Sequence, residues 1–113
     1  MESILTSIKK MLGIAEDYDH FDPEIIMHIN TVLMILKQLG VGPPEGFLIE
    51  DDTSTWVEFV NDSIKLESIK SYVYLRVKLL FDPPLSSAAI ESINRMISEL
   101  EWRINVTAET PSI

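Results

Sequence analysis

The densest group of side chains that could do chemistry lies in one acidic segment, DYDHFDPEIIMH, at residues 17–28. Carboxylates and imidazoles of this kind bind divalent metal ions and can also transfer protons. The candidate ligands are Asp17, Asp19, His20, Asp22, Glu24 and His28. Their spacing matches neither the HExxH helix of a metalloprotease nor an EF-hand loop, which needs glycine at its sixth position. We therefore interpret the segment as a solvated acidic loop that leads into a helix with one partly buried histidine.

The sequence lacks the patterns of other catalytic sites. There is no cysteine, which excludes disulfides, thiolate nucleophiles and cysteine-based zinc sites. No serine stands in a GxSxG elbow. The prolines of GVGPPEG, at residues 40–46, remove backbone amides that a phosphate-binding loop needs. We expect no catalytic residue, no cofactor and no metal, and therefore no enzyme.

The excess of acids limits the possible partners. The chain has 18 acidic and 9 basic residues, a net charge of −9. Residues 1–62 hold twelve acids and three bases, whereas residues 63–113 hold six of each. Affinity for nucleic acids comes from neutralising phosphates, so the chain should not hold DNA through a basic face, although DNA could slide past it. The most apolar window, residues 25–41, is too short and too polar to span a membrane.

The spacing of apolar residues predicts five helices and thus an all-α fold. The expected ranges are about 2–12, 23–39, 54–61, 64–81 and 84–104. Gly13 and Gly40 stand where C-terminal caps belong, and Thr55 has capping-box spacing with Glu58. The second helix is apolar over a broad face, which predicts burial on more than one side, and the fourth is apolar nearly all round. We expect one compact helical domain over residues 1–104.

Two segments of this domain are predicted to be irregular. Residues 41–54, VGPPEGFLIEDDTS, form a loop because they contain two prolines and two glycines, although FLI at 47–49 could make one short strand. Residues 105–113, NVTAETPSI, are polar with a proline near the end, so we expect a flexible C-terminal tail.

The triplet Phe-Asp-Pro occurs twice and is expected to mark two structural corners at helix starts. Aspartate is a strong N-cap, and proline suits the first helical position. In the first copy, Phe21 should pack on Ile26 as a hydrophobic staple. In the second, the proline pair should end one helix and begin the next. The corner residues are Phe21, Asp22, Pro23, Phe81, Asp82, Pro83 and Pro84.

Four residues in the C-terminal half of the sequence are candidates for contacts between copies of the chain. Arg76 and Lys78 interrupt an otherwise apolar helix, either as snorkelling side chains or as bases that meet a neighbour's acids. Trp102 and Arg103 are adjacent, and both types are enriched at interface hot spots. Taken singly, a tryptophan is still more often a core residue.

Taken together, these features give the chain a resemblance to the small all-helical head–tail connector proteins of tailed bacteriophages, also called adaptor or head-completion proteins. The likeness covers roughly residues 2–105. It rests on the order and spacing of ILTSIKKMLGI, FDPEIIMHINTVLMILKQLGVGPPEGF, DDTSTWVEF, YVYLRVKLLFDPP and ISELEWRIN. None of these segments is a catalytic signature.

The resemblance implies a structural protein of the virion neck, made in the cytoplasm of the bacterial host. Such proteins form a ring of about a dozen copies below the portal protein. The ring extends the DNA channel, through which DNA passes without specific binding, and presents a surface to a stopper or tail-completion protein. No membrane is involved.

Within this expected assembly, two hypotheses give roles to two sets of residues, the second from the short polar tail and its β-branched residues. Glu50, Asp51 and Asp52 are expected to face the channel or solvent, where acids repel phosphate. The tail after Ile104, with Asn105, Val106 and Thr107, is expected to dock on the portal by adding a strand to a sheet edge.

Two other hypotheses remain open at this point. A small acidic helical domain that acts as a dimer in interaction or regulation would also explain the buried helices and the charge. A metal-dependent enzyme built on residues 17–28 is a third possibility. A mass measurement separates a ring from a dimer, and bound metal after purification would favour the enzyme.

Overall fold

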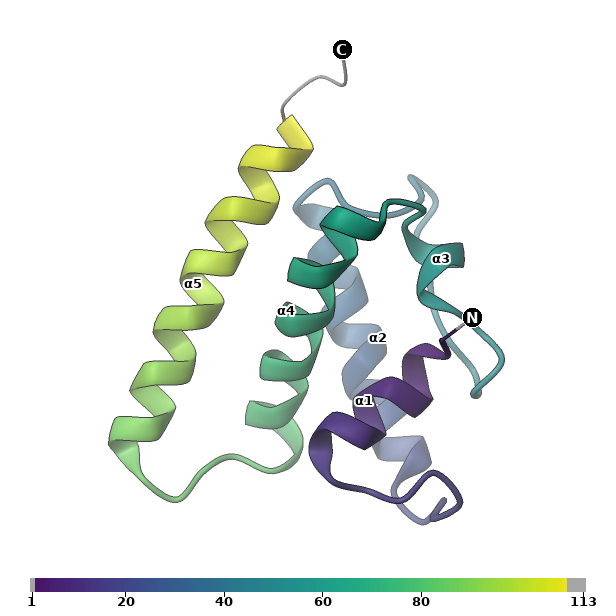
Figure 1. Ribbon diagram of the computed structural model, residues 1–113, viewed down its shortest axis with the longest axis vertical. Helices are drawn as coiled ribbons and strands as arrows, with labels where there is room; N and C mark the ends of the chain where they lie inside the picture. Colours follow the sequence, from purple (N-terminus) through teal and green to yellow (C-terminus); the bar gives the residue numbers. More distant parts are fainter. Residues whose placement is uncertain (1, 110–113) are drawn as a thin grey trace.

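The computed structural model describes residues 2–109, and these fold into five helices (Figure 1). The helices are α1 (Ile4–Leu12), α2 (Asp22–Gln38), α3 (Trp56–Phe59), α4 (Ser63–Phe81) and α5 (Ser87–Glu109). Within the described range, the one β interaction is an isolated antiparallel bridge between Ser3 and Thr55. The predicted all-α fold is confirmed.

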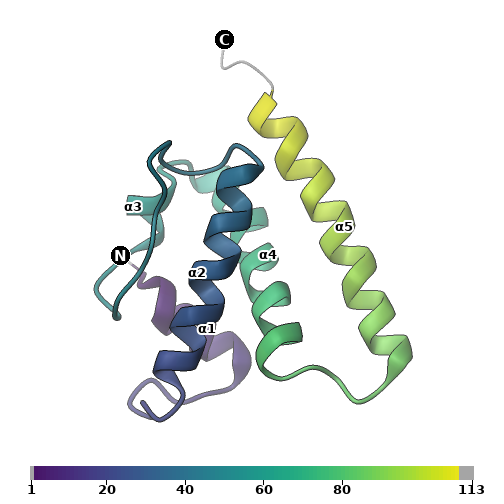
Figure 2. The same ribbon diagram turned by 180° about the vertical axis from the view of Figure 1, so that it is seen from behind.

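Helix α4 lies at the centre because apolar residues occupy most of its circumference. One side, with Glu67 and Ser71, is exposed, so the helix is less fully apolar than its sequence predicts. Helices α1 and α2 pack on it from one side and α5 from the other (Figures 1 and 2). Its buried residues point in several directions around the axis; they are Leu66, Ile69, Tyr72, Val73, Leu75 and Val77. Burying each aliphatic side chain is worth about 1.5–3 kcal/mol, so covering α4 is a large part of what stabilises the fold.

Helix α2 is more exposed than its sequence predicts. Its core-facing stripe is Ile25, Ile29, Val32, Leu33 and Leu36. On the opposite side, Met27 and Met34 are 58% and 56% exposed. The expectation that α2 is buried on more than one side is therefore wrong for the single chain, because no other helix covers that side.

The local end signals of the first three helices are confirmed. Gly13 ends α1 in the left-handed conformation, with φ of 82°, and Gly40 follows α2 with φ of 87°. Only glycine adopts this conformation without steric cost, which is why the helices stop there. Thr55 and Glu58 form the complete capping box of α3.

The first Phe-Asp-Pro corner differs from its prediction. Phe21 takes the N-cap position with no side-chain cap, and Asp22 lies inside the first turn of α2. The Asp22 carboxylate instead lies 2.9 Å from the ammonium of Lys9, which is only 2% exposed. Lys9 Nζ donates its aligned hydrogen bond to the carbonyl of Glu16 at 2.9 Å, so its contact with Asp22 is ionic. Leaving a buried ammonium without a counter-charge costs more free energy than leaving a helix without an N-cap, so Asp22 pairs with Lys9.

The second corner also differs from its prediction. Helix α4 ends at Phe81, residues 82–86 form a linker, and α5 begins at Ser87 rather than at 84. A residue that precedes proline disfavours the helical region, so two consecutive prolines delay the next helix. Ser86 Oγ accepts a hydrogen bond from the amide of Ala89 and supplies the cap that Asp82 does not. The two triplets nevertheless meet, because the rings of Phe21 and Phe81 pack edge to face at 5.3 Å.

Helix α5 continues five residues beyond its expected end. Asn105 and Val106 lie in its last turns, and the helix runs to Glu109. No glycine or proline stops the helix before Pro111. The part of the expected tail up to Glu109 is thus helical, and residues 110–113 lie outside the described residues.

The loop between α2 and α3 contains no strand in the structure. At its middle, Ile49 is 2% exposed and its backbone is held by one side chain. Asn30 Nδ2 donates to the Ile49 carbonyl at 3.0 Å, and the Ile49 amide donates to Asn30 Oδ1 at 2.8 Å. The predicted loop is therefore confirmed, and the short strand that 47–49 could have made is absent; the side-chain amide of Asn30 pairs with this backbone instead.

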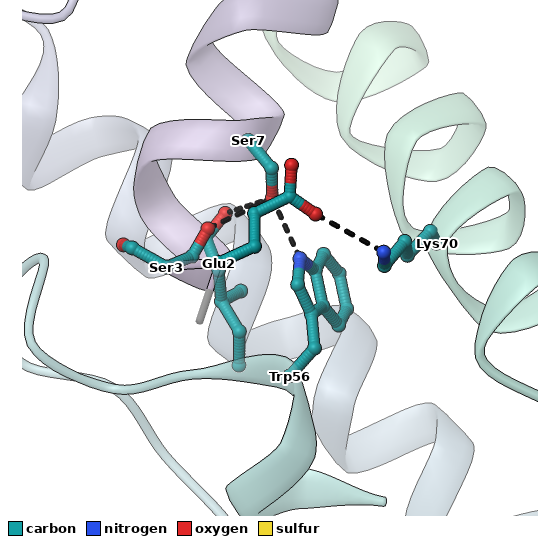
Figure 3. Close-up of polar contacts among 6 residues, drawn as sticks. Glu2, Ser3, Ser7, Trp56 and Lys70 are labelled. Carbon is teal, nitrogen blue, oxygen red and sulfur yellow. Dashed lines mark hydrogen bonds and ion pairs between the residues drawn. The ribbon is translucent and has the colours of Figure 1, made fainter. Parts of the chain in front are cut away.

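A buried polar cluster joins the end of the same loop to α1 and α4. The indole of Trp56 donates to Ser7 Oγ at 2.6 Å, and Ser7 Oγ donates to the carbonyl of Ser3 at 2.8 Å (Figure 3). Beside it, the Lys70 ammonium of α4 pairs with Glu2 at 3.0 Å. The loop is therefore fixed at Ile49 and again at Trp56.

We predict that Ser7→Ala lowers the free energy of unfolding by about 1–3 kcal/mol, because the buried indole N–H of Trp56 loses its acceptor. Urea unfolding should show a lower midpoint with an unchanged slope. Ser98→Ala, at an exposed position of α5, is the matched control and should change stability by less than about 0.5 kcal/mol. Equal stability of the two variants would contradict a role for the hydrogen bond.

Candidate interaction surfaces

The outward side of α5 is an exposed surface that carries a large aromatic residue. The core-facing side of the helix, with Ile97 and Ile104 buried, packs on α4. At 3.6 residues per turn the opposite side carries five residues that we call the outer α5 face. They are Ala88, Arg95, Glu99, Trp102 and Val106, and all five are exposed.

Trp102 dominates this face. Its side chain is 67% exposed, whereas Trp56 is 1% exposed in the core. Of the two tryptophans, only Trp102 is placed to contact another molecule. A tryptophan buries about 150–250 Å² when it is covered, and single exposed apolar residues are otherwise common on surfaces. Trp102 is therefore a candidate anchor for a partner.

The three bases expected at contacts between copies each have an acid partner within their own chain. Lys78 pairs with Asp82 at 2.9 Å, and Arg103 pairs with Glu99 at 2.6 Å. Both are exposed pairs between residues four apart on a helix and contribute little to stability. Arg76 takes part in a larger cluster.

This cluster, which we call the α4–α5 clasp, consists of Tyr72, Arg76 and Glu101. The hydroxyl of Tyr72 donates to Glu101 Oε2 at 2.6 Å and accepts from Arg76 Nε at 3.0 Å. The Arg76 guanidinium also pairs with Glu101. The clasp is the polar link between α4 and α5, so it sets the position from which α5 presents Trp102.

The environment of the clasp shifts the pKa values of all three of its residues, and those of Tyr72 and Glu101 bear on the argument. Burial, followed by the hydrogen bond to Glu101, raises the pKa of Tyr72 to about 12, so its hydroxyl remains a donor at neutral pH. Burial by itself would raise the pKa of Glu101, but the hydrogen bonds from Tyr72 and Arg76 outweigh it. The pKa of Glu101 therefore lies below its ordinary value.

The acids at 50–52 are exposed on a well-held turn. Asp51 Oδ1 accepts hydrogen bonds from the Thr53 hydroxyl at 2.5 Å and the Thr53 amide at 2.9 Å. These two bonds, the side-chain one first, lower the pKa of Asp51. Glu50 and Asp52 are exposed beside it. The loop thus presents three carboxylates from a position fixed by the anchored residues on either side.

A second apolar surface, which sequence analysis did not single out, lies between α2 and the following loop. We call it the α2–loop hollow, and its volume is about 490 Å³. Its lining residues are Leu33, Met34, Lys37, Glu45, Gly46, Phe47 and Leu48. Met34 and Leu48 are 56% and 63% exposed there. The signal available in the sequence was the seven-residue spacing of Met27 and Met34, which places both on one side of a helix.

The acidic segment at 17–28 does not gather into a metal site. Asp22 is engaged with Lys9, and His28 Nε2 lies 3.5 Å from Glu24 Oε2. Among residues 2–109, no three side chains of the metal-binding types come together. In the same part of the chain, no helix combines the length and apolar character needed to cross a bilayer.

Comparison with known proteins identified a family that the chain matches. A family model described as phage connector protein matches residues 4–111, which include all five helices. No curated protein and no solved structure matches the chain.

We predict that Glu101→Gln lowers stability at neutral pH by up to about 1 kcal/mol, a limit set by the partial exposure of the pair. Because the folded-state pKa of Glu101 is depressed, its contribution is present above the ordinary value of 4.5 and is lost as pH falls through the folded-state value. The stability difference between wild type and Glu101→Gln should therefore shrink at acid pH in urea titrations. Glu99→Gln, in an exposed pair, is the control and should show a smaller difference at every pH.

Proposed function

This chain belongs to the phage connector protein family, and we propose on that premise that it is a structural, non-enzymatic protein of the virion neck. In this proposal, copies of the chain assemble as a ring on the portal protein. The ring continues the DNA channel and links the head to the next neck component, a stopper or tail-completion protein. The observation that carries the proposal is the family match over residues 4–111, which takes in the whole helical domain.

The outward side of α5 supports assembly into a ring. Helix α5 packs chiefly on α4, and Trp102 is 67% exposed on its other side. A ring places neighbours against both flanks of each subunit, so it offers cover for such a residue.

The acidic loop supports a channel that lets DNA pass. Glu50, Asp51 and Asp52 are exposed on a loop that is anchored at Ile49 and at Trp56. Fixed carboxylates that line a bore repel phosphates and prevent DNA from binding to the wall.

We place portal docking at the C-terminal end of α5. The residues expected to dock, Asn105, Val106 and Thr107, belong to this helix. Strand addition would first require the last turns of α5 to unfold, so in this proposal the segment docks as a helix end. Residues beyond Glu109 extend the same docking segment.

We predict that the chain forms a cyclic complex with the portal protein encoded in the same phage genome. The complex should appear after co-expression as a ring in electron micrographs, with the chain present in multiple copies. A chain that stays unbound when the portal is present would contradict the proposed function.

A truncated chain tests the docking segment within the same experiment. Removing residues 105–113 keeps the buried Ile104 and the clasp residue Glu101, so the shortened chain should keep its fold by circular dichroism. It should no longer bind the portal. Portal binding that survives the truncation would assign docking to another surface.

We predict that Glu50→Lys with Asp52→Lys slows DNA passage several-fold, because lysines on the channel wall attract phosphates. Asp51 is left unchanged because its carboxylate holds the turn through Thr53. The measurement is the rate of DNA ejection from particles assembled with the variant. Asp17→Lys with Asp19→Lys makes the same charge change at exposed positions elsewhere and should leave the rate unchanged.

A further inference from the structure

We infer that neighbouring copies of the chain contact each other head to tail, with the outer α5 face of one copy seated in the α2–loop hollow of the next. The inference rests on the proposed ring and names the two surfaces that would form it. Its occupant is a second copy of this chain.

One surface projects and the other is hollow, and both carry exposed apolar side chains. The outer α5 face projects Trp102, 67% exposed, with Val106 one turn away and 40% exposed. The hollow offers about 490 Å³ next to Met34 and Leu48, each more than half exposed. Methionine side chains are flexible and polarizable, so they adapt readily to an aromatic ring. The projecting Trp102 would therefore enter a hollow whose exposed apolar side chains, Met34 among them, can adjust to it.

The charges of the two surfaces are also complementary. The outer α5 face carries Arg95 and Glu99, and the hollow is lined by Lys37 and Glu45. Among the ion pairs of residues 2–109, none involves Lys37, Glu45 or Arg95. In a chain with twice as many acids as bases, uncommitted bases are scarce, and each of these surfaces holds one beside an acid. Docking would pair Arg95 with Glu45 and bring Lys37 beside Glu99, which Arg103 already contacts within its own chain.

The two surfaces lie on different sides of the molecule. Figures 1 and 2 show α5 along one edge and the loop that follows α2 toward the other edge. Two different surfaces that fit each other produce a heterologous contact, which repeats from copy to copy and closes into a ring when the rotation allows. Each copy then uses both surfaces at once.

A symmetric contact between two α5 helices is the competing arrangement. It would cover Trp102 but would leave Met34 and Leu48 of both copies exposed to water. It would also stop at a dimer, because one self-complementary face is consumed by one partner. The head-to-tail contact covers both apolar surfaces.

Two variants that each block one surface test the inference. Trp102→Glu blocks the outer α5 face and keeps the hollow, whereas Met34→Glu blocks the hollow and keeps the outer α5 face. Each variant alone should self-associate at least about 30-fold more weakly than wild type, as for loss of an interface anchor. An equimolar mixture of the two should form a 1:1 dimer and nothing larger, because one intact contact remains. Sedimentation velocity distinguishes these states.

Matched controls separate the contact from general effects of the substitutions. Leu85→Glu introduces the same charge at a fully exposed residue of the 82–86 linker, outside both surfaces, and should assemble like wild type. Circular dichroism should show the same helix content in every variant. In wild type, quenching of tryptophan fluorescence by acrylamide should fall on assembly, since Trp102 becomes covered.

Three results would overturn the inference. One is a Met34→Glu chain that self-associates as tightly as wild type, which would indicate the symmetric α5 contact. Another is a mixture of the two variants that stays monomeric. The third is wild-type chain that remains monomeric at about 1 mM, where even weak contacts are populated. None of these results decides the proposed function, which is tested separately by binding of the portal protein.

Discussion

The requirement to cover the apolar sides of α4 governs the rest of the structure. A helix with apolar residues on two flanks cannot lie alone at a surface, so α1 and α2 close one flank and α5 the other. Because α5 packs on α4 along one stripe only, its opposite side is exposed to solvent, and Trp102 lies on that side. The most exposed large aromatic residue of the described chain thus follows from how the centre of the molecule is buried.

The distribution of charge follows from packing in a similar way. Lys9 and Arg76 neutralise acids in buried or half-buried positions, and Lys70 holds the N-terminal segment through Glu2. Bases used for internal structure cannot balance the acids of the loops, so the exposed turn around Asp51 keeps its negative charge. The chain belongs to the phage connector protein family, and in the proposed ring a loop that keeps its outward acids suits a channel wall that does not bind DNA.

Local signals in the sequence predicted most of the fold, and contacts between distant segments account for the errors. Gly13 and the Thr55 capping box act within one helical turn, so their patterns could be read directly. The partner of Asp22 lies on another helix, and Asn30 meets a backbone nineteen residues away, so neither pairing leaves a local pattern. Of the candidate surfaces, the acidic loop and Trp102 were identified from residue type. The hollow beside α2 was missed because exposure of its methionines depends on which neighbours cover that helix.

The single packed side of α5 has a consequence for the order in which the molecule opens. A helix held along one stripe and joined by the short 82–86 linker can detach while α1, α2 and α4 remain together, so its amide hydrogens should exchange through a low-energy partial opening. Association that clamps the same helix from its second side would close that route. Helix α5, the least stable part of the isolated subunit, would then become well protected from hydrogen exchange in the assembled neck. The lifetime of the neck would depend on contacts that form only between subunits.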